Sequence, residues 1–221
     1  MKLETYKQLI PEKLYSLLES RGFNELRPSQ IKSIKAGLFK DKNLVVCTPT
    51  GSGKTLVAEL AILNSLYKNI GKAIYIVPLK ALASEKYKEF KERYKEFKIA
   101  LSIGDIDAPE LYLKEYDIII CTAEKLDSLL RHHAPWLKDV KTVVVDEVHL
   151  INDVERGPTL EVLITILKTL LKDIQIIALS ATIGNPKDLA DWLNAELIID
   201  KWRPVKLEQG VFLNGEIEFV E

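Results

Sequence analysis

A glycine-rich segment between two apolar runs constrains the fold of this chain more than any other feature. Residues 48–55 read TPTGSGKT. They follow the short apolar run 43–47, which is typical of a buried strand, and they precede residues 56–63, whose apolar positions suit a buried helix. A strand, a glycine loop and a helix in this order form the setting of a phosphate-binding loop. The sequence therefore predicts a nucleotide-binding fold of the α/β class.

The residue types in this loop suit a nucleoside triphosphate and a metal ion. Gly51 and Gly53 allow the backbone to turn sharply, so that successive N–H groups converge on the phosphates. We expect Lys54 to reach the β- and γ-phosphates and the Thr55 hydroxyl to bind Mg²⁺. The remaining loop positions predicted to contact the nucleotide are Thr50 and Ser52.

Two adjacent carboxylates follow a second apolar run. Asp146 and Glu147 come directly after residues 142–145, so we expect them at the carboxyl end of a buried strand, where open α/β sheets bind ligands. Asp146 would share one Mg²⁺ with Thr55, and Glu147 would orient and deprotonate the water that attacks the γ-phosphate. An ordinary turn and a solvated strand end would explain either motif alone, but both motifs in order favour an ATP site.

Composition and charge limit the class of protein. The 221 residues are 47% hydrophobic, which is enough for one sizeable core. The formal net charge of −1 argues against a surface that coats polyanions generally, so a nucleic acid would bind in a local groove. Cys47 and Cys121 lie in apolar runs, which indicates buried free thiols in a reducing compartment. With no run of membrane-spanning length and no signal peptide, we expect a cytoplasmic protein without a membrane partner.

Apolar runs and amphipathic segments alternate along the chain, which predicts a mostly parallel sheet with helices on both faces. The charged run 86–98 carries aromatic residues at helical spacing, which favours an amphipathic helix over a stripe that stacks on nucleic acid. The predicted strands are residues 43–48, 73–77, 98–103, 117–121, 141–146, 174–179 and 196–199. The predicted helices are residues 11–21, 28–39, 53–69, 80–97, 122–132, 158–171 and 186–193.

Eight segments match a helicase family in order along the chain. They are residues 23–30 (glutamine motif), 48–55 (motif I), 78–86 (motif Ia), 122–125 (motif Ib), 146–149 (motif II), 156–161, 180–182 (motif III) and 202–205. From residue 14 to residue 219 the chain resembles the first motor domain of superfamily 2 DExH helicases of the Ski (superkiller-like) branch, and within it the archaeal Hjm-type DNA helicases. The resemblance implies a RecA-like P-loop NTPase domain at residues 28–200. Residues 1–27 would be a helical extension, and residues 201–221 a strand segment.

The resemblance also assigns roles outside the phosphate loop. Gln30 would read adenine, because an amide offers a donor and an acceptor to the base edge. Motifs Ia and Ib each begin a helix just after a strand, so their N–H groups would cradle the phosphates of a nucleic acid, with side chains adding contacts. The predicted nucleic-acid contacts are Pro78, Leu79, Lys80, Thr122 and Lys125. The residues implied to couple the nucleotide state to strand binding are His149, Ser180 and Thr182.

Two features depart from general patterns, and one of them bears on activity. Thr48 stands where the general phosphate-loop pattern has glycine, a difference that the resembling branch tolerates. The arginine-rich segment of the family's second motor domain, which supplies an arginine finger, is absent from the 221 residues. We therefore expect an N-terminal fragment or a truncated product that binds ATP and Mg²⁺, hydrolyses ATP feebly and does not unwind alone. The resemblance implies a second RecA-like domain, winged-helix and ratchet domains in the intact protein.

The favoured function is the ATP-dependent motor domain of a replication or repair DNA helicase. It would act as a monomer on single-stranded or forked DNA. An RNA helicase of the same branch stays open, because phosphate contacts carry little information about the sugar. A P-loop kinase for a small molecule would leave motifs Ia, Ib and III without a role. A nucleotide-sensing module without catalysis is the fourth alternative.

Overall fold

Seven parallel strands form the centre of the protein. The computed structural model describes residues 1–104, 110–171, 173–205, 208–213 and 215–220. The sheet order is β3-β4-β2-β5-β6-β1-β7, and every pair in it is parallel. The strands are β1 Leu44–Cys47, β2 Lys72–Val77, β3 Ile99–Ser102, β4 Ile118–Thr122, β5 Val140–Val145, β6 Gln175–Ser180 and β7 Glu196–Ile199. The predicted α/β fold with a parallel sheet is confirmed.

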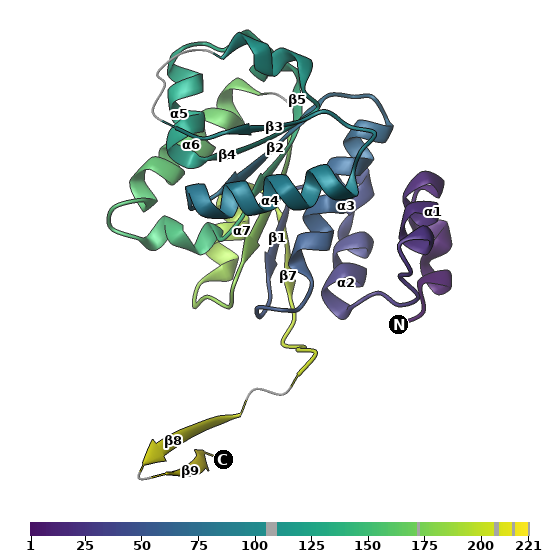
Figure 1. Ribbon diagram of the computed structural model, residues 1–221, viewed down its shortest axis with the longest axis vertical. Helices are drawn as coiled ribbons and strands as arrows, with labels where there is room; N and C mark the ends of the chain where they lie inside the picture. The colour runs from purple at the N-terminus through teal and green to yellow at the C-terminus, as the bar shows by residue number, and fades with distance from the viewer. Residues whose placement is uncertain (105–109, 172, 206–207, 214, 221) are drawn as a thin grey trace.

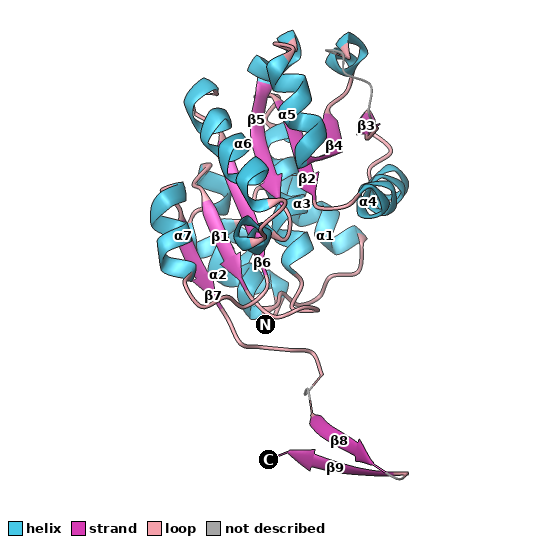
Figure 2. Ribbon diagram, turned by 90° about the vertical axis from the view of Figure 1, so that its left-hand side faces the viewer, coloured by secondary structure: helices cyan, strands magenta, loops and turns pink. Residues whose placement is uncertain are grey.

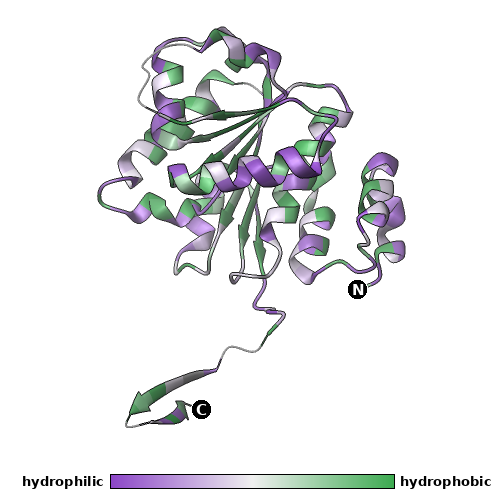
Figure 3. Ribbon diagram, in the orientation of Figure 1, coloured by the Kyte–Doolittle hydropathy of each residue, from purple (hydrophilic) through white to green (hydrophobic). Residues whose placement is uncertain are grey.

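Helices cover both faces of this sheet (Figure 1, Figure 2). Helices α1 to α4 pack on one face, and α5 to α7 pack on the other. The inner strands are buried on both sides, which explains their continuous apolar sequences and their hydrophobic colour in Figure 3, whereas Glu196 and Ile199 of the edge strand β7 are exposed. The helices are α1 Glu12–Ser20, α2 Pro28–Ala36, α3 Lys54–Tyr67, α4 Lys80–Arg93, α5 Ala123–Arg131, α6 Gly157–Leu170 and α7 Pro186–Leu193. The 3₁₀ helices are Leu3–Leu9, Leu38–Lys40, Leu111–Glu115, Pro135–Asp139 and Val148–Asn152.

The N-terminal extension belongs to the same hydrophobic core as the sheet. Leu14 and Leu18 of α1 are fully buried in the cluster that also contains α3. Arg21, just after α1, forms an ion pair of 3.2 Å with Glu59 of α3. These contacts fix the chain that leads into the glutamine motif against the helix of the phosphate loop.

Helix α4 ends four residues earlier than the sequence predicts. It stops at Arg93, because Tyr94 leaves the helical region with φ −123° and ψ 64°. Phe90 and Tyr94 are fully buried, and their rings meet edge to face at 5.4 Å. The aromatic stripe is therefore part of the core, which confirms the amphipathic interpretation.

The C-terminal segment forms a two-stranded antiparallel hairpin. It comprises β8 Gln209–Leu213 and β9 Glu216–Val220, and it extends away from the sheet in Figure 1. Phe212, Ile217 and Phe219 are more than half exposed. Among the described residues, no helix is long and apolar enough to cross a membrane.

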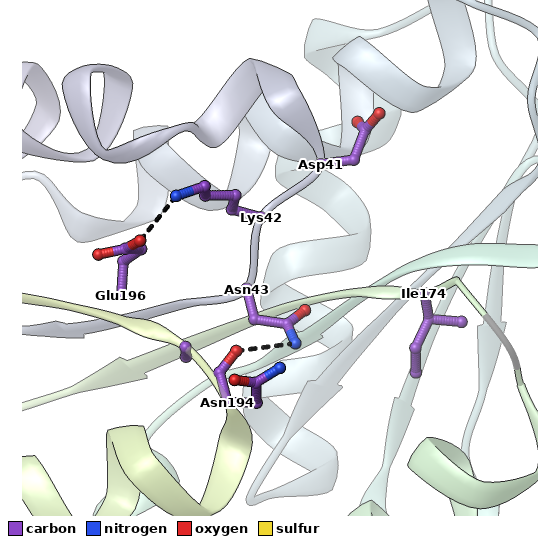
Figure 4. A pocket seen from close by; sticks show the side chains of 7 residues that line it. Asp41, Lys42, Asn43, Ile174, Asn194 and Glu196 are labelled. Carbon is purple, nitrogen blue, oxygen red and sulfur yellow. Dashed lines mark hydrogen bonds and ion pairs between the residues drawn. The ribbon is translucent and has the colours of Figure 1, made fainter.

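The amino edge of the sheet is held together by a polar cluster (Figure 4). Asn43, just before β1, lines a cavity of about 470 Å³. Its side-chain Nδ2 donates to the carbonyl oxygens of Leu193 (3.2 Å) and Asn194 (3.4 Å), and its Oδ1 accepts a hydrogen bond from the N–H of Ile176 (2.8 Å). One amide thus joins β1 to β6 and to the end of α7.

Candidate functional site

The carboxyl edge of the sheet brings the sequence motifs together in a row. Because β1, β6 and β5 are neighbours, the loop of motif III lies between the loops of motifs I and II. On the far side of β5 come β2 and β4, which lead into motifs Ia and Ib. Five segments that are separated in sequence therefore share one edge, which is where open parallel sheets bind ligands.

The phosphate loop takes the backbone shape that its glycines predict. Gly51 and Gly53 have φ of +79° and +91°, the left-handed region that favours glycine. A Cβ at Gly53 would lie 2.6 Å from Nε2 of Gln30, so the position also lacks room for a side chain. The Thr48 hydroxyl lies 2.7 Å from that of Ser52, within hydrogen-bond distance. This bond gives Thr48 a structural role where the general pattern has glycine.

Lys54 begins α3 and lies close to the acidic pair. Its Nζ donates a 2.9 Å hydrogen bond to the carbonyl oxygen of Thr48 within the loop. Burial lowers the pKa of Lys54, although the negative charges of Glu147 and Asp146 act to raise it. The structure thus brings Lys54, Asp146 and Glu147 within electrostatic reach of one another, as the sequence predicts. A bound polyphosphate would add negative charge beside the ammonium and favour its charged form.

Asp146 follows β5, and both of its carboxylate oxygens accept hydrogen bonds. Oδ1 accepts from the N–H of Glu147 (3.0 Å), and Oδ2 accepts from the phenol of Tyr75 on β2 (2.9 Å). Burial, followed by the charge of Asp146, raises the pKa of Tyr75 well above its ordinary value, so the phenol remains a donor. Sequence reasoning missed Tyr75. Its signal was a hydroxyl-bearing ring inside the otherwise aliphatic run 73–77.

Glu147 sits in a strained backbone conformation. Its φ of +51° is uncommon for a residue with a side chain, and such positions cluster at functional sites. Its Oε2 lies 3.2 Å from Nδ1 of His149, a contact that becomes a hydrogen bond when Nδ1 carries a proton. Neither atom has another hydrogen-bond partner among the described residues. The predicted water-positioning carboxylate and the predicted coupling histidine therefore touch.

Motif III is tied to motif I through the backbone. The carbonyl oxygen of Ser180, the last residue of β6, accepts a 3.2 Å hydrogen bond from the N–H of Thr48. Ser180 is fully buried, whereas Thr182 is exposed beyond the strand end. Any shift of the phosphate loop would therefore act on the end of β6.

Gln30 lines a cavity of about 530 Å³ beside the phosphate loop. Its Nε2 donates to the carbonyl oxygen of Gly53 (3.2 Å), and its Oε1 accepts from the N–H of Arg27 (2.8 Å). The amide keeps a second N–H and further lone pairs for a ligand. Other residues that line the cavity are Phe23, Thr55, Glu59 and Arg93. The volume suits a nucleoside.

The five predicted nucleic-acid contacts divide into two groups. Leu79 and Lys80 are exposed and Pro78 is half-buried, at the start of α4. Thr122 and Lys125 are buried, contrary to the expectation of side chains that reach out to phosphates. The Thr122 hydroxyl caps α5 by accepting from the N–H of Lys125 (3.4 Å).

The burial of Lys125 has a specific partner. Its Nζ lies 3.0 Å from Oε1 of Glu110, and its side chain is 2% exposed. Glu110 in turn accepts a hydrogen bond from the Ser102 hydroxyl (2.5 Å). A buried charge needs a partner, and Lys125 finds it in Glu110. The ion pair therefore links α5 to Glu110, which in turn bonds Ser102 at the end of β3.

The segment 156–161, which also matches the family, reaches the site. Arg156 lines a small pocket with Pro78, Glu124, Asp146 and Glu147, so it meets motifs Ia, Ib and II.

Residues 200–205 pass over the phosphate loop. The guanidinium of Arg27 lies 5.5 Å from the ring centre of Trp202. The Pro204 ring comes within 3.8 Å of the place where a Cβ at Gly51 would be. The segment after β7 thus contacts both the glutamine motif and motif I.

Comparisons with known proteins agree with this geometry. A family model described as DEAD/DEAH box helicase matches residues 27–189. The ATP-dependent DNA helicase Hel308 of Pyrococcus horikoshii is 53% identical over 97% of this chain, and that of Methanocaldococcus jannaschii is 56% identical over 95%. The chain spans 30% and 18% of the lengths of these two relatives. A crystal structure of the DUF1998 helicase MrfA bound to DNA and AMPPNP matches 87% of this chain and 29% of that one, with a TM-score of 0.74 and 30% identity.

Proposed function

The chain belongs to the DEAD/DEAH box helicase family, and we propose that it is the ATP-binding motor domain of an ATP-dependent DNA helicase. The observation that carries this proposal is the row of motif loops along the carboxyl edge of the sheet, with Lys54 electrostatically coupled to Asp146 and Glu147. Two named DNA helicases that are more than half identical to the chain support DNA as the nucleic acid.

The residues at this edge fit a Mg²⁺ ion. The Thr55 hydroxyl and the Asp146 carboxylate offer hard oxygen ligands, and Mg²⁺ in nucleotide sites takes one or two carboxylates together with phosphate oxygens and water. When bound, the ion would neutralise charge on the β- and γ-phosphates. Lys54 would add a second positive charge on the same phosphates.

Glu147 would provide the base. In hydrolysis a water oxygen forms a bond to the γ-phosphorus while the bond to the β,γ-bridging oxygen breaks, and Glu147 takes the proton of the water. The contact with His149 would hold the carboxylate until nucleotide and nucleic acid are both in place. Release of this contact would link strand binding to catalysis.

The nucleic acid would bind at the first turns of α4 and α5. Their backbone N–H groups can receive phosphate oxygens, and Lys80 adds charge at the exposed turn. Thr122 and Lys125 would support this surface from inside, since their side chains are already engaged there. We propose single-stranded or forked DNA as the ligand, with RNA as the alternative to be tested.

Full turnover would require a second motor domain. An arginine finger from such a domain is worth about 10³–10⁵ in rate in related phosphoryl transfers. Translocation also needs two domains that close and open on the strand. We therefore propose that the 221 residues bind ATP and Mg²⁺ and weakly bind single strands, but hydrolyse ATP slowly and do not unwind.

Nucleotide binding, hydrolysis and unwinding by the 221-residue chain test the proposal together. A fluorescent ATP analogue should bind in Mg²⁺ and be displaced by ATP more readily than by GTP. Glu147→Gln should retain this binding and lower basal hydrolysis at least tenfold. Robust unwinding by the chain alone, or unchanged hydrolysis in E147Q, would contradict it. Stimulation by single-stranded RNA but not DNA would replace DNA by RNA.

A further inference from the structure

We propose that Tyr75 is a positioning residue for Asp146, and that its buried phenol holds the carboxylate in the orientation that binds the metal ion of the nucleotide. This inference rests on the function proposed above. It adds a residue on β2, which lies outside every motif of the sequence, to the machinery of the site.

The hydrogen bonds of Asp146 leave its carboxylate little freedom. One oxygen accepts from the N–H of Glu147 at 3.0 Å, and the other accepts from the Tyr75 phenol at 2.9 Å. A carboxylate offers about four lone-pair positions, so each oxygen keeps one for a metal ion or its water. The backbone donor comes from the next residue in the chain, whereas the phenol comes from a neighbouring strand. Tyr75 is therefore the contact that fixes the side chain relative to the sheet.

The hydroxyl at this position is not needed to fill space. Tyr75 is fully buried on β2, and its strand neighbours Ala73, Ile74, Ile76 and Val77 are buried aliphatic residues. A buried hydroxyl costs free energy unless it is hydrogen-bonded, and its partner here is Asp146. A phenylalanine would fill the same volume without that requirement.

The ring of Tyr75 is itself held in place. Phe90 of α4 meets it edge to face, with ring centroids 5.6 Å apart and planes at 74°. Helix α4 starts at Lys80, in the proposed nucleic-acid surface. The side chain that orients the metal ligand thus packs directly on the helix whose first turn would contact the strand.

Tyr94 provides a matched control within the same core. It is also fully buried, its ring also packs edge to face on Phe90, and its phenol also donates to a carboxylate. That carboxylate is Glu59 in the middle of α3, rather than Asp146. Tyr75→Phe and Tyr94→Phe each delete one hydroxyl from one buried ring–carboxylate pair, but only Y75F alters the metal ligand.

Binding of Mn²⁺ as an EPR-visible substitute for Mg²⁺ tests the inference without relying on activity. The 221-residue chain is titrated with Mn²⁺ in the presence of ADP, and ADP binding is measured separately in EDTA. We expect Y75F to weaken Mn²⁺ binding about tenfold, the lower end for lost partners of metal ligands, and to leave metal-free ADP affinity within twofold. Y94F should leave Mn²⁺ affinity within twofold, because its partner Glu59 is not a proposed metal ligand. Thermal unfolding of both variants fixes a temperature at which each is folded.

The outcomes separate the two proposals. Equal Mn²⁺ affinity in Y75F and the unmodified chain would overturn the positioning role and leave the proposed function intact. An equal loss in Y94F would also overturn it, because the effect would then come from the core in general. If the unmodified chain bound no Mn²⁺ with ADP, the proposed function itself would fail, and the inference with it.

Discussion

The two edges of the central sheet carry similar polar residues, but these residues differ in how far their hydrogen-bonding groups and charges are satisfied. At the amino edge, the amide of Asn43 is bonded to three backbone groups, and Lys42 pairs with Glu196 at 2.7 Å. At the carboxyl edge, the hydrogen bond of Lys54 goes to a carbonyl oxygen of its own loop, and burial lowers the pKa of Lys54. Glu147 meets His149 there in a left-handed backbone conformation.

The difference separates a structural polar cluster from a functional one. Amino-edge groups satisfy each other, so they stabilise the fold and leave little for a ligand, although Gln175 Oε1 has no hydrogen-bond partner among the described residues. Carboxyl-edge groups are held near one another with unmet hydrogen-bonding capacity, and burial disfavours the charge of Lys54, which the phosphates of a nucleotide would favour. Cavity size alone does not distinguish them, because both edges carry cavities of several hundred Å³. Substitutions at the amino edge should therefore change the stability of the fold, whereas substitutions at the carboxyl edge should change ligand binding.

Lys54→Ala should give the largest effect, and it should lower ATP hydrolysis without lowering stability. The variant loses the charge that neutralises the β- and γ-phosphates, so ATP hydrolysis should drop about 10²–10³-fold. Because the ammonium is partly desolvated and its hydrogen bond goes to a loop carbonyl, the melting temperature should stay unchanged or rise. Calorimetric unfolding and a phosphate-release assay measure the two quantities. A large fall in melting temperature with retained hydrolysis would show that Lys54 is structural, contrary to the role assigned to the carboxyl edge.

Asn43→Ala should show the opposite pattern. It strips the partner from the N–H of Ile176 and from the carbonyl oxygen of Leu193, and we expect a loss of about 1–3 kcal/mol in the free energy of unfolding. Affinity for ATP should remain within twofold. Urea unfolding and nucleotide titration on the same preparation check both statements.

Asn43→Asp is the matched control for this position. It keeps the acceptor for Ile176 and removes the amide donors, so its loss of stability should be intermediate. A change in nucleotide affinity in either variant would show that the amino edge is not merely structural.

The sequence was a good guide to what is local. Each of the seven parallel strands was predicted, the inner ones because a strand buried on both faces is continuously apolar. The phosphate loop and the Asp146–Glu147 pair were recognisable because their neighbours along the chain set their conformation. The roles of these residues at the site stay predictions.

Features set by contacts between distant segments were missed. The bond from Tyr75 to Asp146 depends on the pairing of β2 with β5, and the burial of Lys125 depends on Glu110 reaching α5. The end of α4 at Arg93 depends on Tyr94 turning into the core. By contrast, the Asn-Gly pair at 214–215 is a local hairpin signal, and the prediction of a strand segment at 201–221 did not use it.

Gln30→Ala should have a smaller, selective effect at the carboxyl edge. The amide tethers Gly53, so affinity for every nucleotide should fall modestly. If the remaining N–H and lone pair form hydrogen bonds with adenine, the preference for ATP over GTP should fall roughly tenfold. A tenfold change corresponds to about the free energy of one hydrogen bond. Competition titrations with both nucleotides give this ratio. An equal loss for ATP and GTP would assign Gln30 to the shape of the loop and not to the base.

Lys42→Ala should have the smallest effect, and it shows which polar contact at the amino edge matters. The Lys42–Glu196 pair is short, at 2.7 Å, but both side chains are about half exposed. Water and salt screen such a pair, so we expect less than about 0.5 kcal/mol of stability to be lost, well below the loss in N43A. Urea unfolding at low and at 0.5 M salt measures the difference. A loss as large as that of N43A would mean that charge pairing contributes as much to the stability of this edge as the Asn43 amide does.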